Sequence, residues 1–240
     1  AYTAYADIKL WVFLTSQVPA EKMREVALYG TEVIKVTGTY DEAKHVASDF
    51  AKRRQIHLDK GAKAIGGKES MKTLAFEIAE QLPRVNLNGQ VKWQAPDWYV
   101  QAVSGGIGPL GVLKGFQELY KMGLTDRVPK IGVVQTDGCA PMVQSMAANQ
   151  PEAIPVRPQS HIVVLSTGNP GLAYPILREA QLENGGAMVS VSDEHAFDAM
   201  RQLARRQGIS VEPATAVAFA GLEKMIADGK DDDDIDEDDT

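Results

Sequence analysis

Short apolar segments alternate with amphipathic segments along most of the chain, and this alternation constrains the fold more than any other feature of the sequence. The apolar segments are rich in bulky and β-branched side chains, which predicts strands buried on both faces. The amphipathic segments are long enough to form helices. A chain that alternates strand and helix builds a mostly parallel sheet with helices on both faces. The sequence therefore predicts an α/β fold.

The expected elements follow from these segments and from their boundary residues. Pro19 suits the first turn of a helix, and Gly30 suits the left-handed residue that ends one. The expected strands cover residues 8–14, 32–36, 98–103, 130–134, 162–165 and 187–191. The expected helices cover residues 20–29, 40–54, 70–82, 110–122, 172–184, 193–207 and 213–227, with one more beginning near Pro141.

Two lobes and a connection are expected along the chain. Residues 1–60 form part of a smaller α/β lobe, residues 61–69 a glycine-containing connection, and residues 70–227 a larger α/β lobe with an inserted loop at 86–94. Residues 228–240 are an acidic tail that repels itself and can bury little apolar area. We expect this tail to be disordered.

The charge distribution argues against several classes of partner. The chain has 25 basic and 32 acidic residues and a formal net charge of −7, but eight of the acidic residues lie in the tail at 231–240. The rest of the chain is nearly neutral, so no broad basic face for nucleic acid is expected, and we interpret Lys52, Arg53 and Arg54 as the solvated end of a helix. No apolar run approaches the roughly 18 residues that cross a bilayer, and no secretory leader is recognisable. We expect a cytoplasmic protein.

Side chains that often perform catalysis or bind metals are scattered along the chain. The single cysteine, Cys139, allows no internal disulfide, and together with four dispersed histidines it makes no metal-ligand spacing. We expect no metal site. Cys139 is interpreted as a small buried residue, His161 and His195 as surface or capping side chains, and Glu212 and Asp193–Glu194 as charges at helix starts.

A glycine-rich turn between the strand at 98–103 and the following helix is the strongest candidate site. It reads Ser-Gly-Gly-Ile-Gly-Pro over residues 104–109. Consecutive N–H groups in such a turn converge, and a helix start adds partial positive charge, so the turn predicts a phosphate site. The candidate ligands are the amides of Gly105, Gly106, Ile107 and Gly108. Pro109 has no N–H to donate. An alternative stays open: the glycines only permit close packing of strand and helix.

Three glycines of this region leave a different ligand open. Gly106, Gly108 and Gly111 fit the G-x-G-x-x-G pattern of dinucleotide-binding enzymes, and Asp137, at the end of the next expected strand, could accept from a ribose hydroxyl. Two strand–helix units precede this motif, which counts against that interpretation. An NAD-dependent oxidoreductase is therefore kept as an alternative.

Several separate blocks of the chain resemble the threonine synthase family of pyridoxal-phosphate enzymes, which shares its fold, fold type II, with the tryptophan synthase β subunit. The blocks span nearly all of residues 1–227. They are VFLTSQVPAEKMREVALYGTEVIKVTG at 12–38, GKESMKTLAFEIAEQL at 67–82, the segment 96–115, VVQTDGCAPMVQS at 133–145, GNP at 168–170, VSDE at 191–194 and EPATA at 212–216.

The resemblance implies a two-lobed type-II fold, pyridoxal 5'-phosphate as cofactor and a small amino-acid substrate. The implied reaction is that of a lyase in threonine biosynthesis, which converts O-phosphohomoserine to threonine and phosphate. The family's phosphate-binding loop maps onto Gly105–Gly108, and Pro109 stands where many members have asparagine. The resemblance leaves a homodimer open.

The resemblance also implies that parts of the family's site are absent from this chain. The aldimine-forming lysine and the asparagine loop lie upstream of the position that matches Ala1, and the strand whose hydroxyl meets the pyridine nitrogen would follow Ala227. We therefore expect a chain truncated at both ends and inactive alone, with its catalytic residues unknown. Lys72 and Lys114 are interpreted as solvated helix residues rather than substitutes, and Thr167 as part of a segment that does not meet the ring. A non-catalytic subunit or scaffold that pairs with a partner is a further alternative.

Overall fold

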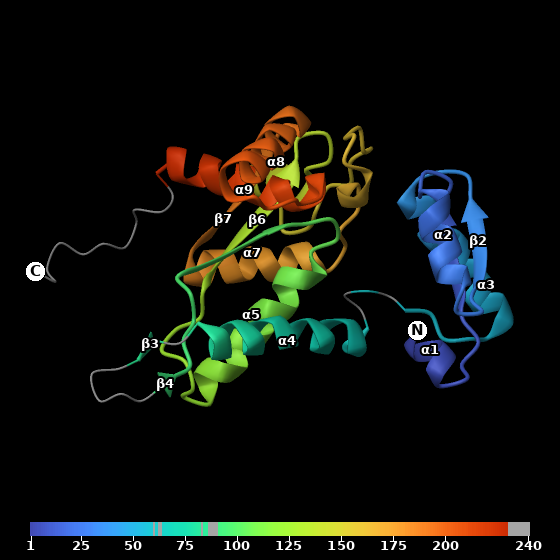
Figure 1. Ribbon diagram of the computed structural model, residues 1–240, viewed down its shortest axis with the longest axis horizontal. Coiled ribbons are helices and arrows are strands. Elements are labelled where there is room, and N and C mark those ends of the chain that lie inside the picture. The colour runs from blue at the N-terminus through green and yellow to red at the C-terminus, as the bar shows by residue number, and fades with distance from the viewer. Residues whose placement is uncertain (60, 62–63, 83, 86–90, 230–240) are drawn as a thin grey trace, which may run out of the picture. The chain divides into compact units, whose positions relative to one another are not determined.

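The computed structural model describes residues 1–59, 61, 64–82, 84–85 and 91–229, which group into two compact units, residues 1–60 and 61–240 (Figure 1). The acidic end of the expected tail, residues 230–240, lies outside the described residues, as do residues 86–90 of the expected inserted loop. In the described part of the chain, no helix is both long enough and apolar enough to cross a membrane.

The first unit contains a small parallel sheet. Its elements are α1 (Tyr2–Tyr5), β1 (Trp11–Thr15), α2 (Ala20–Ala27), β2 (Glu32–Val36) and α3 (Tyr40–Arg54). The two strands pair in parallel along their whole length, with Trp11 opposite Glu32. A reciprocal cap begins α3, because the Thr39 hydroxyl accepts from the amide of Glu42 while the Glu42 carboxylate accepts from the amide of Thr39. The rings of Trp11 and Phe13 on β1 pack against Phe50 of α3, with ring centroids 5.7 and 5.3 Å apart.

The second unit is built on three parallel strands in the order β5-β6-β7. The strands are β5 (Trp98–Ala102), β6 (Lys130–Thr136) and β7 (Gly186–Val191). The helices are α4 (Ile65–Gln81), α5 (Ile107–Lys121), α6 (Pro141–Ala147), α7 (Ala173–Asn184), α8 (Asp193–Gln207) and α9 (Pro213–Ala227). A separate antiparallel pair is formed by β3 (Arg84–Val85) and β4 (Val91–Lys92).

Helices cover both faces of the three-stranded sheet (Figure 1). Alternate residues of β6 face opposite sides, as the pleat of a strand requires. Val133 packs in a core with Leu113 of α5 and Leu177 of α7, whereas Val134 packs in another core with residues of α8 and α9 such as Ala216. The expected α/β architecture, with parallel sheets and helices on both faces, is confirmed.

One expected strand is wrong. Residues 162–165 do not join the sheet; Val163–Leu165 form a single 3-10 turn. Leu165 is buried in the core beneath α8 and α9, but Val163 and Val164 are 50% and 63% exposed. The apolar β-branched run was expected to be a buried strand. Its backbone instead makes a local hydrogen bond, from the amide of Leu165 to the carbonyl of Ile162.

The helix α4 starts earlier than expected and pairs closely with α5. Residues 65–69, expected in the connection, form its first turns. Added Cβ atoms would collide across the pair at three levels: Gly67 with Ile107, Gly111 with Met71 and Gly115 with Ala75. The same offset of residue numbers recurs at each level, so the two helices run in the same direction and both begin at the same end.

Candidate phosphate-binding site

The glycine-rich turn lies between the carboxyl end of β5 and the first residue of α5, which is Ile107 rather than the expected Leu110. Gly106 is the residue before the helix and has φ of 81° and ψ of 13°. This left-handed conformation costs a side-chain-bearing residue about 1–2 kcal/mol, so glycine is the natural occupant. The amide of Leu110 donates to the carbonyl of Gly106 and closes the first turn.

The amides of the turn are available to a ligand. Among the residues that the structure describes, no hydrogen bond uses the amide of Gly105, Gly106, Ile107 or Gly108. The first N–H groups of a helix have no partner within it, and α5 is 15 residues long, so its start carries partial positive charge. A phosphate requires several N–H donors and a positive field, and unpartnered amides at a helix start can supply both.

Close packing explains some of the glycines but not all of them. A Cβ at Gly106 would lie 2.7 Å from the terminal methyl carbon of Met142, and a Cβ at Gly108 would lie 2.6 Å from the carboxamide of Gln101. Gly111 faces α4, as described above. In contrast, a Cβ at Gly105 would meet no atom within 4 Å. The three glycines of the dinucleotide pattern are thus accounted for by packing, whereas Gly105 borders open space beside the unpartnered amides.

A hydroxyl pair adjoins the turn. The Oγ atom of Ser104, the residue directly before Gly105, lies 2.5 Å from the Oγ1 atom of Thr167, and either hydroxyl can donate. Thr167 is 3% exposed and belongs to the long segment between α6 and α7. Sequence reasoning gave Thr167 no part in this site, because residues 104 and 167 share no periodic or motif relation that could signal the contact.

Other side chains support this end of the sheet. The Oε1 atom of the fully buried Gln135 accepts from the amides of Met142 and Val143, at 2.9 and 3.2 Å, and so caps α6. The carboxylate of Asp193 accepts from the hydroxyl of Ser160 at 2.8 Å and from the amide of His161 at 2.6 Å. Asp193 therefore anchors the segment that carries Thr167. Sequence reasoning assigned Gln135 no role, because a polar side chain at a strand end has many uses.

Three residues that were expected to be structural, Cys139, His195 and Glu212, lie in the core, at the surface and at a helix start, as expected. Cys139 is buried, with 1% exposure. The ring of His195 lies 2.9 Å from the carboxylate of Glu223 at the surface between α8 and α9. Glu212 precedes α9 without a side-chain cap hydrogen bond. In the part of the chain that the structure covers, no group of three or more His, Cys, Asp or Glu side chains could hold a metal ion.

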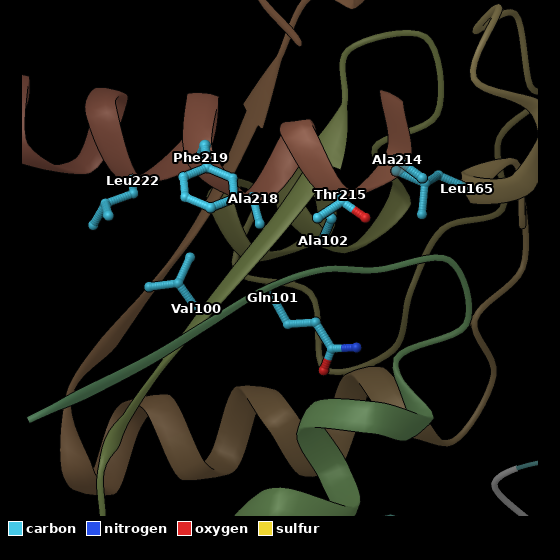
Figure 2. Close-up of a pocket in the computed structure, with 9 residues that line it drawn as sticks. All are labelled: Val100, Gln101, Ala102, Leu165, Ala214, Thr215, Ala218, Phe219 and Leu222. Carbon is cyan, nitrogen blue, oxygen red and sulfur yellow. The ribbon is translucent and has the colours of Figure 1, made fainter. Parts of the chain in front are cut away.

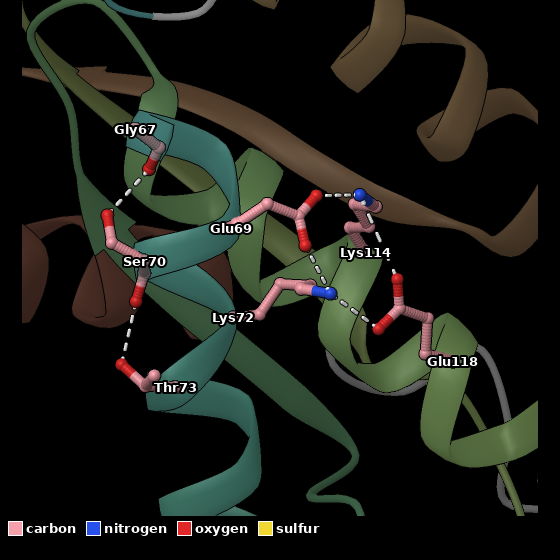
Figure 3. Close-up of polar contacts among 7 residues, drawn as sticks. All are labelled: Gly67, Glu69, Ser70, Lys72, Thr73, Lys114 and Glu118. Carbon is pink, nitrogen blue, oxygen red and sulfur yellow. Dashed lines mark hydrogen bonds and ion pairs between the residues drawn. The ribbon is translucent and has the colours of Figure 1, made fainter. Parts of the chain in front are cut away.

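Both lysines weighed as substitutes belong to an ion cluster between α4 and α5 (Figure 3). Glu69 pairs with Lys72 and Lys114, and the Nζ atom of Lys72 also lies 2.7 Å from Glu118. Hydrogen bonds from Lys114 and then Lys72 lower the pKa of Glu69 to about 2. The hydrogen bonds to Glu118 and Glu69 raise the pKa of Lys72.

The ion cluster corrects the expectation that Lys72 is a solvated residue, and it supports the expectation that Lys72 does not replace the aldimine-forming lysine. The side chain of Lys72 is only 14% exposed, so it is a paired rather than a solvated residue. A protonated lysine has no lone pair with which to attack an aldehyde. The carboxylates that stabilise the charged form of Lys72 therefore oppose its use as a nucleophile.

An apolar groove of about 450 Å³ runs beside β5 (Figure 2). It lies between the strand residues Val100 and Ala102 and the α9 side chains Ala218, Phe219 and Leu222. The side chain of Gln101 points away from α9, and the hydroxyl of Tyr99 donates to its Oε1 atom at 3.0 Å. In the described residues, β5 pairs with β6 on one side only, so this groove follows an open sheet edge.

Comparison with known proteins identifies the kind of chain that carries this site. A profile of the family described as pyridoxal-phosphate dependent enzyme matches residues 1–238. A threonine synthase from Methanocaldococcus jannaschii is 34% identical over 231 residues, which cover 95% of this chain and 54% of the relative. A threonine synthase from Methanosarcina acetivorans is 32% identical and covers 94% of this chain and 53% of the relative. The chain thus spans about half the length of these relatives.

Solved structures with a similar fold have more varied activities. An L-serine ammonia-lyase from Rhizomucor miehei has a TM-score of 0.74 at 19% identity and covers 94% of this chain and 66% of the other. A threonine deaminase from Solanum lycopersicum has a TM-score of 0.70 at 19% identity and covers 93% of this chain and 59% of the other. At this level of identity the likeness shows a shared fold.

Proposed function

The chain belongs to the family of pyridoxal-phosphate-dependent enzymes. We propose that it is part of a lyase of the threonine synthase type and that its glycine-rich turn binds the cofactor's phosphate. The observation that carries the proposal is the set of four unpartnered amides at the start of α5, in the turn onto which the family's phosphate loop maps. The threonine synthase relatives support the reaction: conversion of O-phosphohomoserine to threonine and phosphate.

The chain's own contribution is binding and orientation. When bound, pyridoxal phosphate withdraws electrons from the substrate carbons next to the amine. Gly105, Gly106, Ile107 and Gly108 donate N–H groups to the phosphate, and the positive end of α5 stabilises its charge. Charge-assisted hydrogen bonds contribute about 1.5–3 kcal/mol each, without simple additivity, so the turn holds the phosphate by several kcal/mol.

Residues 1–240 by themselves are proposed to lack turnover. The two lysines weighed as substitutes, Lys72 and Lys114, are both held by carboxylates. Treatment with pyridoxal phosphate and borohydride, followed by peptide mass spectrometry, is expected to label no lysine specifically, and no threonine should form from O-phosphohomoserine. A stoichiometric label on Lys72 or Lys114 together with threonine formation contradicts this part of the proposal. A lysine-bearing protein that co-purifies and restores turnover favours a subunit that needs a partner.

Amide NMR tests the phosphate turn directly. Titration of the 15N-labelled chain with pyridoxal phosphate, and separately with inorganic phosphate, is expected to shift the amides of Gly105, Gly106, Ile107 and Gly108 and to leave that of Gly208, at the end of α8, in place. Shifts spread evenly over the chain, or no saturable shift at all, would refute the site. NAD should cause no shift in the turn.

A matched pair of variants separates charge from shape at Gly105, where a side chain meets open space. Gly105→Asp places a carboxylate beside the amides and is expected to abolish phosphate binding. Gly105→Asn has nearly the same shape without the charge, so it is expected to bind phosphate better than Gly105→Asp. Both variants should melt within a few degrees of the parent protein. Equal binding by the two variants counts against an anion site.

The remaining assignments belong to the same proposal. We propose residues 1–60 as part of the smaller lobe and residues 70–227, together with residues 65–69 of α4, as the larger lobe, which limited proteolysis between the two would test. Family membership supports an amino-acid substrate. We also propose a cytoplasmic location and a homodimer, to be tested by cell fractionation and by sedimentation of the protein.

A further inference from the structure

We propose that Thr167 is a positioning residue for the phosphate turn: its hydroxyl holds Ser104 so that the amides following Ser104 are already oriented when the anion arrives. The inference rests on the proposed function, because it concerns the same turn. It adds a residue from a different part of the chain, on a segment separated from the turn by α5, β6 and α6.

The contact joins the buried hydroxyl of Thr167 to the half-buried hydroxyl of Ser104. The two hydroxyl oxygens are 2.5 Å apart, and the Thr167 side chain is almost completely buried. Burying a hydroxyl without a partner costs free energy, whereas valine has the same shape and no such cost. The polar group at this position is therefore accounted for by its bond to Ser104.

The segment that carries Thr167 is anchored independently of the turn. Asp193 holds Ser160 and His161, and the amide of Val156 donates to the carbonyl of Gly168 at 3.0 Å, next to Thr167. A side chain orients its partner well only when its own backbone is fixed. These bonds supply a fixed base for Thr167 at the end of the sheet where the turn lies.

The turn needs such a constraint because two glycines follow Ser104 directly. Gly105 and Gly106 have more backbone freedom than other residues, and that freedom is lost when a ligand orders them. Fixing the side chain of Ser104 restricts the chain at the entrance to this pair before the ligand binds. Part of the ordering cost is thereby met during folding, which raises the affinity for the anion.

The test uses the full 240-residue chain and measures the dissociation constants of inorganic phosphate and pyridoxal phosphate by calorimetry. Thr167→Val removes the hydroxyl and keeps the shape, and it is expected to weaken binding of both ligands about tenfold, which corresponds to about 1.4 kcal/mol at 25 °C. Thr167→Ser keeps the hydroxyl and is expected to bind within about threefold of the parent protein. Rescue by serine is a result that a purely space-filling role would not produce.

Thr136→Val is the matched control. Thr136 is another fully buried threonine, at the end of β6, and its Oγ1 atom has no hydrogen-bond partner among the described residues. Removing this hydroxyl should leave both dissociation constants unchanged. Melting temperatures without ligand are recorded for every variant, so that loss of fold is separated from loss of affinity.

A second variant covers the case in which Thr167→Val does not fold. Ser104→Ala removes the other half of the pair and is also expected to weaken binding about tenfold. Unchanged binding in Thr167→Val, or in Ser104→Ala if Thr167→Val is unfolded, overturns the inference while the phosphate site stands. If the parent protein binds neither ligand, the proposed function itself fails.

Discussion

A methyl group added at Gly115 tests how closely α4 and α5 must approach. Its Cβ would lie 2.6 Å from the Cβ of Ala75 and 3.1 Å from the carbonyl oxygen of Lys72, whereas carbon atoms in contact normally lie about 3.5–4.0 Å apart. The helices must therefore separate by roughly 1 Å, and overpacking of this kind costs about 1–3 kcal/mol. Alanine regains about 1 kcal/mol of helix propensity. We expect Gly115→Ala to lose up to about 2 kcal/mol of unfolding free energy.

The compensating change is Ala75→Gly, which removes the methyl group that the new one would strike. Alone, Ala75→Gly is expected to lose about 1–2 kcal/mol, because it gives up helix propensity and a fully buried methyl group. In the double variant, the carbonyl of Lys72 becomes the nearest neighbour of the new methyl group and needs to shift by only a few tenths of an ångström. The double variant should be no less stable than Ala75→Gly alone, so the coupling free energy should be at least as large as the loss in Gly115→Ala.

Urea unfolding followed by circular dichroism measures all three variants, with thermal unfolding as a check at about 2–4 °C per kcal/mol. Gly66→Ala is the control. Gly66 is exposed in the first turn of α4, the helix that carries Ala75, and its Cβ would meet nothing within 4 Å. This control should be neutral or stabilising by up to about 1 kcal/mol. Losses that simply add in the double variant would refute the proposed close contact between the helices.

Three further predictions concern the second unit. The folded pKa of Glu69 is lowered from 4.5 to about 2, so the ionised carboxylate stabilises the fold above pH 4.5 and this contribution is lost as the pH falls toward 2. Glu69→Gln should therefore reduce the dependence of the unfolding free energy on pH over that range. An unchanged dependence would contradict the pairing. Gly106→Ala should lose about 2 kcal/mol more than Gly105→Ala in urea unfolding, because only Gly106 has a left-handed backbone and close neighbours; equal losses would argue against that conformation. Gln135→Met should lose about 1–3 kcal/mol by leaving one buried and one partly buried amide of α6 without their acceptor, and a neutral result would contradict the cap.

Elements with strong local signals were predicted well. The expected strand at 32–36 and the helices at 40–54, 193–207 and 213–227 have the bounds observed in the structure. Their signals are carried by near neighbours: apolar periodicity within each element and capping side chains such as Thr39 and Ser192 at its start. The strand expected at 162–165 failed because an apolar β-branched run does not reveal whether a neighbouring strand is available to pair with it.

The glycine-rich turn could be recognised from the order strand, glycines, helix, because a turn of this kind depends on residues that are adjacent in the chain. The partners of that turn could not be recognised in the same way. Thr167 meets Ser104, Gln135 caps α6, and Glu69 pairs with Lys114 only because folding brings together segments that are distant or unrelated in sequence. Local periodicity is a property of neighbouring residues and is legible in the sequence, whereas contacts between distant side chains depend on how the strands and helices are finally packed.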